Sequence, residues 1–226
     1  MTEDPTAALD AAGREALQRV LALLAEERAS VSSVVDERAW RVHVADSLTG
    51  LEVDDLRSAA RIADVGAGAG FPGLALAVAS PDARVDLIES VGRKCAFMTR
   101  AAEDAGIANA TVLNTRSEDL AAAEGRERYD AVTARAVGRL STLAELASPL
   151  LKPNGVLVAW KGRRDDEEES QLASAAAALA MTPERILDVG NRAGSEHRHL
   201  HVIRKTGPTP DGLPRRAGMA KKRPKG

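Results

Sequence analysis

The 226-residue sequence predicts an α/β protein whose Rossmann-like, mostly parallel sheet has seven strands. A short apolar run at 62–65 is followed directly by a glycine-rich turn and then by residues with helical spacing. Apolar runs of strand length then alternate with helical segments, which is typical of parallel strands joined by crossovers. The last two strands have no helix between them, and so close a pair must be antiparallel, because a parallel return needs a crossover of about a dozen residues.

The glycine-rich turn at 66–73 predicts a nucleotide-type ligand. Gly66, Gly68 and Gly70 occupy alternate positions, and Gly68, Gly70 and Gly73 also satisfy the dinucleotide pattern G-x-G-x-x-G. Glycine allows backbone angles that are closed to other residues, and it lets a ligand approach the backbone without meeting a Cβ. The glycines alone do not distinguish NAD from S-adenosylmethionine, and a tight turn without a ligand is the alternative.

The other elements follow from apolar spacing and turn composition. Strands are expected at 62–65, 83–89, 110–114, 129–134, 156–160, 185–189 and 199–203, and helices at 5–30, 34–48, 74–79, 92–105, 140–151 and 171–180. Residues 152–155 have the composition of a turn. The acidic run at 165–169 suits a helix N-terminus, where acids complement the macrodipole, better than it suits a metal site. We therefore expect a helical N-terminal extension at 1–50, a Rossmann-like domain at 51–205 and a basic tail at 206–226.

Polar side chains follow the second, third and fourth strands at their C-terminal ends, where doubly wound folds bind ligands. Glu89 ends the second strand about twenty residues after the glycines, where an acid accepts hydrogen bonds from ribose hydroxyls. Its position suits NAD and S-adenosylmethionine equally, and a surface acid at a strand end is the alternative. Ser117 and Glu118 follow the third strand and are expected beside an adenine edge. Arg135 follows the fourth strand and is expected to point into the same crevice.

The N-terminal helices contain one further pair of polar residues. His43 and Asp46 are three positions apart, so they share a helix face and are expected to pair. Such a pair is more often a structural hydrogen bond than a catalytic dyad. The chain has four histidines and one cysteine, and their positions make no zinc-ligand cluster, so no metal is expected.

Charge is distributed unevenly over the chain, whose formal net charge is −2. From 204 to 226 there are eight basic residues and one acid, so this segment is about +7 and the rest is about −9. A basic tail on an acidic body indicates contact with phosphates, or else a solvated tail without a partner. Cys95 is the single cysteine, which excludes an intramolecular disulfide and fits a reducing compartment. The chain shows no apolar run of membrane-spanning length and no signal-peptide core, so a cytoplasmic protein is expected.

Several sequence blocks together resemble one family. They are HVADS at 43–47, DVGAGAGFPG at 64–73, ES at 89–90 with RK at 93–94, RSE at 116–118, ARAV at 134–137, KG at 161–162, and TP at 209–210 with PR at 214–215. In this order they resemble the bacterial small-subunit ribosomal RNA guanine-N7 methyltransferases, also called glucose-inhibited division protein B or RsmG. The segment His197-Arg198-His199-Leu200 departs from the family's usual Glu-Arg-His-Leu at its first position, although Glu196 precedes it.

The resemblance implies a class I S-adenosylmethionine-dependent methyltransferase fold and methyl transfer to N7 of a guanine in the 530 loop of 16S rRNA. It implies that Gly66, Gly68, Gly70 and Phe71 border the methionine and ribose portions of the cofactor, that Glu89 holds the ribose, and that Ser117 and Glu118 border the adenine. It places Arg135 at the cofactor site. Candidates for rRNA phosphates are Arg116, Lys161, Arg198, Arg215 and Arg216. Replacing Arg215 and Arg216 by alanine is expected to weaken RNA binding without changing cofactor affinity.

No catalytic base is expected, because guanine N7 has a free lone pair and no proton to remove. Catalysis then depends mainly on positioning, and Arg135, the nearest candidate for a catalytic group, more plausibly binds than reacts. A monomer is the default expectation. The alternatives are a small-molecule methyltransferase on the same fold, a non-catalytic RNA-binding factor that senses the cofactor, and, more distantly, an NAD enzyme.

Overall fold

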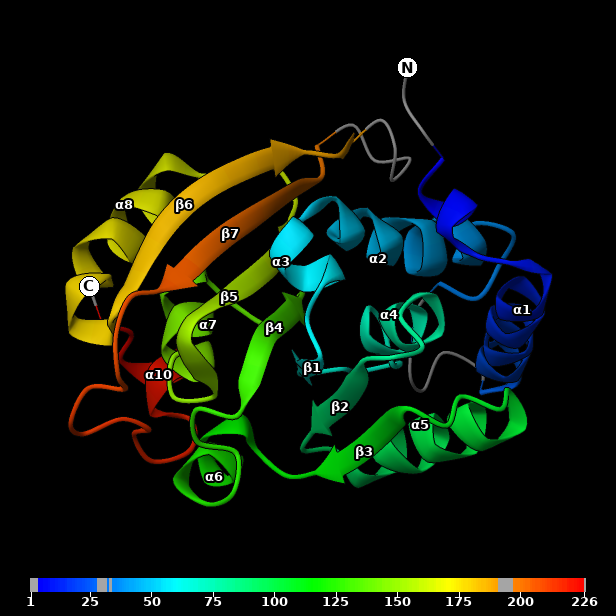
Figure 1. Cartoon of the computed structure of the whole chain (residues 1–226), viewed down its shortest axis with the longest axis horizontal. Coiled ribbons are helices and arrows are strands. Elements are labelled where there is room, and N and C mark those ends of the chain that lie inside the picture. The colour runs from blue at the N-terminus through cyan, green and yellow to red at the C-terminus, as the bar shows by residue number, and fades with distance from the viewer. Residues whose placement is uncertain (1–3, 28–31, 33, 191–196, 226) are drawn as a thin grey trace.

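A single mixed sheet forms the middle layer of the protein (Figure 1). The computed structural model describes residues 4–27, 32, 34–190 and 197–225. The strand order is β3-β2-β1-β4-β5-β7-β6, and within the described part of the chain β7 alone runs against its neighbours. The strands are β1 (Arg61–Val65), β2 (Arg84–Glu89), β3 (Ala110–Asn114), β4 (Tyr129–Arg135), β5 (Leu151–Lys161), β6 (Met181–Asp188) and β7 (His199–Lys205). The first five strands are parallel, and β6 and β7 form the antiparallel pair that follows them, which confirms the predicted fold class.

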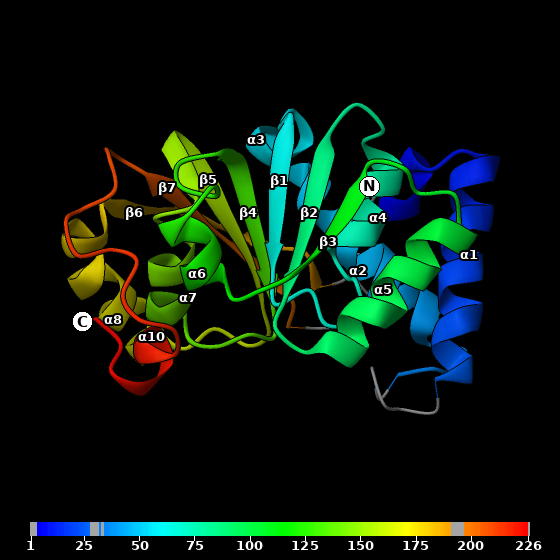
Figure 2. The same cartoon turned by 90° about the horizontal axis from the view of Figure 1, so that it is seen from below.

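Helices cover both faces of the sheet (Figure 2). One face carries α2 (Asp46–Leu48), α4 (Gly73–Ala79) and α5 (Gly92–Asp104), with α1 (Ala11–Glu26) packed outside α4 and α5. The other face carries α6 (Ser117–Ala122), α7 (Leu140–Ala147), α8 (Asp166–Ala175) and the short α10 (Met219–Lys222). The remaining short elements are η1 (Pro5–Ala8), η2 (Trp40–Ala45), η3 (Thr49–Glu52), α3 (Asp54–Arg57) and η4 (Ala177–Leu179). None of the helices in the described ranges combines the length and the apolar character that crossing a membrane requires.

Two hydrophobic clusters hold these layers together, one on each face of the sheet. Successive residues of β1 alternate between them, since Ile62 belongs to the first cluster and Ala63 to the second. Small residues let the helices lie close to the strands. At Gly73, the first residue of α4, a Cβ would lie 2.1 Å from the side chain of Leu87 on β2, so only glycine permits this approach.

The N-terminal region is less helical than the periodicity predicts. The expected helix at 5–30 is replaced by η1 and α1, because the Asp10 side chain accepts a hydrogen bond from the Gly13 N–H at 2.7 Å and starts α1 there. The expected helix at 34–48 begins only near Trp40, as the π-helical turn η2. The Asp36 side chain accepts from the Arg38 N–H at 3.0 Å, and this local turn competes with helix formation. Residues 28–31 lie outside the described residues.

The C-terminal half also departs from the expected boundaries. β5 starts at Leu151, so the predicted turn at 152–155 falls within the bounds of the strand. The pairing is irregular there, and Asn154 has φ +69°, as a bulge requires. β6 starts at Met181 rather than 185, α7 ends at Ala147, and the expected helix at 171–180 is divided between α8 and η4.

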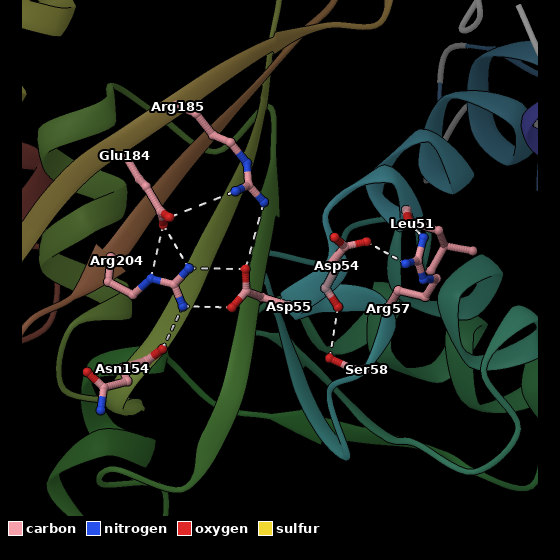
Figure 3. A network of polar contacts seen from close by, with 9 residues as sticks. All are labelled: Leu51, Asp54, Asp55, Arg57, Ser58, Asn154, Glu184, Arg185 and Arg204. Atoms are coloured by element: carbon pink, nitrogen blue, oxygen red, sulfur yellow. Dashed lines mark hydrogen bonds and ion pairs between the residues drawn. The ribbon is translucent and has the colours of Figure 1, made fainter.

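An ion-pair network lies at the end of the sheet where the parallel strands begin and stabilises it (Figure 3). Arg204, near the end of β7, pairs with both oxygens of Asp55 on α3 at 2.7 and 3.1 Å. The same guanidinium contacts Glu184 at 2.8 Å and the Asn154 carbonyl at 2.9 Å. This network joins α3 to β6 and β7 at the edge opposite the C-terminal ends of β1, β2 and β4, so we assign it a structural role.

Candidate functional site

The glycine-rich turn leaves bare backbone at the C-terminal end of β1. Gly66, Gly68 and Gly70 have φ values of +69°, +60° and +90°, which side chains rarely tolerate. A Cβ on Gly68 would meet only the Gly66 carbonyl, at 3.7 Å, so this α-carbon faces open space. The amides of Gly66 and Ala67 donate to the Ile88 carbonyl at 2.8 and 3.1 Å, which folds the turn over the end of β2. A ligand can therefore approach this backbone closely.

The buried carboxylate of Asp64 fixes the position of the glycine-rich turn. Asp64 on β1 accepts hydrogen bonds from the Gly73 N–H at 2.9 Å and from the Thr133 hydroxyl at 3.0 Å. Complete burial raises the pKa of this carboxyl to about 6, and the two hydrogen bonds partly oppose that shift. In the sequence, Asp64 stands out only as part of the block at 64–73. Its role is visible only when β1, β4 and the start of α4 are brought together.

Glu89 lies at the crevice end of β2, as predicted. Its carboxylate accepts from the Gly68 N–H at 3.2 Å and from the Val91 N–H at 2.9 Å, and the residue is 8% exposed. The Asn114 side chain donates to the Glu89 carbonyl at 3.1 Å, which fixes the backbone as well. An acid held in this way is preorganised to accept hydrogen bonds from a diol.

A cavity of about 420 Å³ opens beside Glu89 at the C-terminal edge of the sheet. Its walls come from the ends of β1 and β2, the loop before α6, the turn after β4 together with α7, and the C-terminal tail. The neighbours β1 and β4 lie where the strand order reverses, which is where open α/β sheets bind ligands. Of the predicted cofactor residues, Gly66, Glu89, Ser117 and Glu118 line this cavity, and so does Arg116, which we predicted to bind RNA.

Phe71 and Arg135 lie outside the lining of this cavity, in a neighbouring polar cluster with His43, Asp46 and Arg198. The Phe71 ring stacks on the His43 ring, with centroids 5.0 Å apart and planes 22° apart. Arg135 donates from Nη1 to the Val42 carbonyl at 2.8 Å and to the Asp46 carboxylate at 2.9 Å. Gly70 faces the side chains of Leu74 and Met98, so its glycine also serves packing. The eight predicted cofactor residues therefore divide between the cavity and the glycine turn with its neighbouring cluster.

The expected His43–Asp46 pair is wrong. Asp46 instead binds Arg135 and lies 2.7 Å from Arg198 Nε, a close ion pair that lacks hydrogen-bond alignment. His43 Nε2 lies 2.9 Å from the Val34 carbonyl. The reason is that η2 winds as a π-helix, with i→i+5 bonds, so residues three apart do not align as they do in an α-helix.

His43 is neutral near pH 7. Burial lowers its pKa below the ordinary value, and the nearby Arg135 charge lowers it further, although the hydrogen bond with the Val34 carbonyl acts in the opposite direction. We assign the proton to Nε2, which then donates to that carbonyl and leaves Nδ1 as an acceptor 3.4 Å from Arg135 Nη2. His43 thus connects the Phe71 ring to Arg135.

The five residues predicted to bind RNA phosphates differ in whether their charges are already paired with an acidic side chain. Lys161 donates to Glu168 at 2.6 Å, Arg198 pairs with Asp46, and Arg215 forms a two-pronged ion pair with Glu145. Arg116 and Arg216 are exposed and form no ion pair with another described residue. These two are therefore the candidates with charges still available to a phosphate.

The tail is packed against the body of the protein, contrary to the alternative of a solvated tail. Leu213 and Ala220 are buried, and the Gly218 N–H donates to Glu118 at 2.7 Å. Gly218, Ala220 and Lys221 line the cavity. These three residues were not predicted from the sequence, because the apolar positions of the tail are few and lie among basic ones.

The described residues contain no group of three or more His, Cys, Asp or Glu side chains placed to hold a metal ion. Glu196 lies outside the described residues, and His197 is exposed beside Arg163.

The sheet with one inserted antiparallel strand and the crevice at the strand reversal define a class I methyltransferase fold. Solved structures share it. A SAM-dependent methyltransferase from Aquifex aeolicus matches with a TM-score of 0.57 and 18% identity, covering 76% of this chain and 94% of that one. The [4+2]-cyclase SpnF matches with a TM-score of 0.59 and 15% identity, covering 88% and 97%. Because the second is a cyclase, the fold alone does not define the reaction.

Sequence comparison identifies the family. The sequence model of "GidB: rRNA small subunit methyltransferase G" matches residues 14–200. Ribosomal RNA small subunit methyltransferase G of Rubrobacter xylanophilus is 41% identical over 229 residues, covering 96% of this chain and 88% of that protein. The Gloeobacter violaceus protein of the same name is 39% identical, covering 84% and 76%. The chain belongs to this family of rRNA methyltransferases, which confirms the resemblance, the enzyme class and S-adenosylmethionine as cofactor.

Proposed function

We propose that the protein transfers the methyl group of S-adenosylmethionine to N7 of a guanine in the 530 loop of 16S rRNA. The observation that supports this most directly is the cavity bounded by Gly66, Glu89 and Ser117 at the strand reversal of a chain that belongs to an rRNA methyltransferase family. The cavity is within the size range of small-molecule sites, roughly 300–1,000 Å³.

The residues around the cavity fit an adenosine-containing cofactor. The preorganised Glu89 carboxylate suits the two ribose hydroxyls, and the open α-carbon of Gly68 admits close contact with the backbone. Ser117 and Glu118 suit the edge of the adenine, and the Phe71 side of the turn suits the methionine portion. When bound, S-adenosylmethionine supplies an electrophilic methyl group on a sulfonium sulfur.

The protein's contribution to the chemistry is positioning. Guanine N7 attacks through a lone pair in the plane of the ring, the N7–carbon bond forms as the sulfur–carbon bond breaks, and the positive charge moves from sulfur to the base. No proton leaves in this step, so a neutral His43 held against Arg135 need not act as a base. We propose that Phe71, His43 and Arg135 form the rigid side of the site, where orientation lowers the barrier.

We propose that the RNA lies across the C-terminal edge of the sheet, where Arg116 and Arg216 present exposed charges to phosphates. The other three cations then stabilise the structure beneath this surface through ion pairs with acidic side chains; they are Lys161, Arg198 and Arg215. We further propose a monomeric cytoplasmic enzyme, organised as the extension at 1–50, the domain at 51–205 and the tail at 206–226.

The test uses methyl-labelled S-adenosylmethionine with small ribosomal subunits, and separately with their free RNA, both lacking the modification. The rRNA is then cleaved specifically at N7-methylguanosine. One labelled, cleavable guanine in the 530 loop is the expected result. Cofactor binding without transfer to either substrate would contradict the proposal and would favour the small-molecule enzyme or the cofactor-sensing factor.

A further inference from the structure

The C-terminal segment, residues 213–222, is attached to the body by a series of specific contacts. Arg215 forms its ion pair with Glu145 on α7, a carboxylate that is only 3% exposed. The Arg126 guanidinium donates to the Leu213 carbonyl at 2.8 Å, and the Thr142 hydroxyl donates to the Ala220 carbonyl at 3.3 Å. Both views show α10 beside α7 (Figures 1 and 2). A buried carboxylate with one guanidinium partner makes this attachment energetically significant.

The inner side of this segment forms part of the cavity wall. Gly218, Ala220 and Lys221 line the same cavity as Glu89 and Ser117. The Gly218 N–H donates to one carboxylate oxygen of Glu118 at 2.7 Å, and the Ser117 hydroxyl donates to the other oxygen at 3.2 Å. The segment therefore both shapes the wall and orients a side chain predicted to border the adenine.

The outer side of the same segment is strongly basic. Arg216 and Lys222 are exposed, as is Arg223 directly after the segment, and none of the three forms an ion pair with another residue in the described ranges. RNA phosphates would therefore meet one side of a segment whose other side faces the cofactor cavity. Anything that orders this segment stabilises both surfaces together.

We infer that the C-terminal segment completes the cofactor site and couples cofactor binding to RNA binding. This inference rests on the proposed function for the identity of the two ligands. RNA bound to the outer side holds the segment against α7 and raises cofactor affinity, and by thermodynamic reciprocity the cofactor raises RNA affinity by the same factor. Because Arg215 anchors the cavity wall, we now expect its replacement to weaken cofactor binding. This replaces the expectation from the sequence that cofactor affinity is unchanged.

The first experiment measures the Kd of S-adenosylhomocysteine by calorimetry in the absence of RNA. Arg215→Ala is expected to raise this Kd about tenfold, because the wall loses its anchor. Arg204→Ala is the matched control. Its side chain is 25% exposed against 23% for Arg215, and it also makes a two-pronged ion pair, but at the opposite edge of the sheet. The control should keep the Kd of the unmodified protein, and an unchanged Kd in Arg215→Ala would overturn the inference.

Lys221→Ala provides a second test that does not break an anchor. Lys221 is exposed and lines the cavity, so its removal changes the wall without removing a buried ion pair. A Kd raised by about threefold or more is expected, because the wall loses a side chain that lines the cavity. If Arg215→Ala does not fold, as thermal unfolding would show, an unchanged Kd in Lys221→Ala contradicts the inference by itself.

The second experiment repeats the titration with a saturating RNA fragment containing the 530 loop. The fragment is expected to lower the Kd of S-adenosylhomocysteine about fivefold in the unmodified protein and to have no such effect in Arg215→Ala. RNA that binds without changing the cofactor Kd would overturn the coupling. Failure of the RNA to bind the unmodified protein would contradict the RNA substrate and the coupling together, while the first experiment would still decide whether the segment belongs to the cofactor site.

Discussion

Asp64 places a fully buried carboxylate beneath the glycine-rich turn, where it links three segments of the chain. Its two oxygens bind the first amide of α4 and a hydroxyl on β4, so the position of the turn depends on this one side chain. Burial disfavours the charged form, and the two hydrogen-bond donors offset only part of that cost, which is why its pKa is raised to about 6.

The variant Asp64→Asn should therefore change how stability depends on pH. In the unfolded chain the carboxyl titrates near 3.8, and in the folded protein near 6, so between these values the folded state binds more protons. The contribution of Asp64 to the free energy of unfolding then falls as pH rises through this window and stays low above it. Asparagine has nearly the same shape and does not titrate. Relative to the unmodified protein, the variant should gain on the order of 2 kcal/mol between pH 4 and pH 7.

Urea unfolding at several pH values measures this difference directly. His43 titrates in both proteins, and its lowered pKa acts in the opposite direction, so its effect cancels in the comparison. A difference in unfolding free energy that stays constant from pH 4 to pH 7 would show that Asp64 is not the residue responsible.

Glu89→Gln tests the residue assigned to the ribose. The carboxylate accepts two backbone N–H groups at once, whereas an amide must turn its NH₂ group toward one of these donors. Charge-assisted hydrogen bonds to a diol are lost as well, so the Kd of S-adenosylmethionine should rise by about tenfold or more. Glu184→Gln, in the network at the opposite edge of the sheet, is the control and should keep the original Kd. An equal Kd in both variants would remove Glu89 from the cofactor site.

A site residue was predictable where its position follows from the strand it ends, and was not predictable where it depends on a contact between distant parts of the sequence. Glu89 and Ser117 were located correctly at the crevice because strand ends in a doubly wound sheet meet at one edge. The partners of Arg135 were not predictable, since Asp46 is 89 positions away and directly follows a π-helical turn that the apolar spacing does not reveal.

At the scale of the elements, the turn between η4 and β6 contains backbone strain that is unrelated to the site. Ala180 ends η4 with φ +50°, in the left-handed region where glycine is preferred. Ala180→Gly should therefore stabilise the protein by about 1 kcal/mol, because a Cβ is unfavourable in this conformation. Ala177→Gly, three residues earlier in η4, should instead destabilise by about 0.5–1 kcal/mol, since glycine is unfavourable inside a helix. Denaturant midpoints measure both, and a destabilised Ala180→Gly variant would contradict the strain.

The same scale explains where element prediction succeeded and failed. β1, β2, β4 and the second half of β5 were predictable because buried parallel strands are continuous apolar runs bounded by glycine, proline or charged residues. The start of the helix near Trp40 was not, because the Asp36 side chain satisfies a backbone amide locally. The packed tail was missed because Leu213 and Ala220 are single apolar positions without periodicity.

At the scale of the whole molecule, charge is segregated although the formal net charge is only −2. The acidic body contributes many of its carboxylates to internal ion pairs such as Glu145 with Arg215 and Asp55 with Arg204. In the C-terminal segment, the exposed Arg216 and Lys222 form no ion pair with another described residue. An acidic protein can thus present basic residues to RNA near the cavity.

This arrangement predicts how RNA binding responds to salt. Arg216→Ala and Lys222→Ala should each reduce the slope of log Kd against log salt by about 0.7–0.9, the value for one phosphate contact. Arg204→Ala should leave the slope unchanged, because its charge is paired with Asp55 and Glu184 at the far edge. Binding of a 530-loop RNA fragment, measured at several salt concentrations, gives all three slopes. If Arg216→Ala and Lys222→Ala keep the slope of the unmodified protein, the outer side of the C-terminal segment is not a phosphate-binding surface, and the RNA must approach the cavity over Arg116 instead.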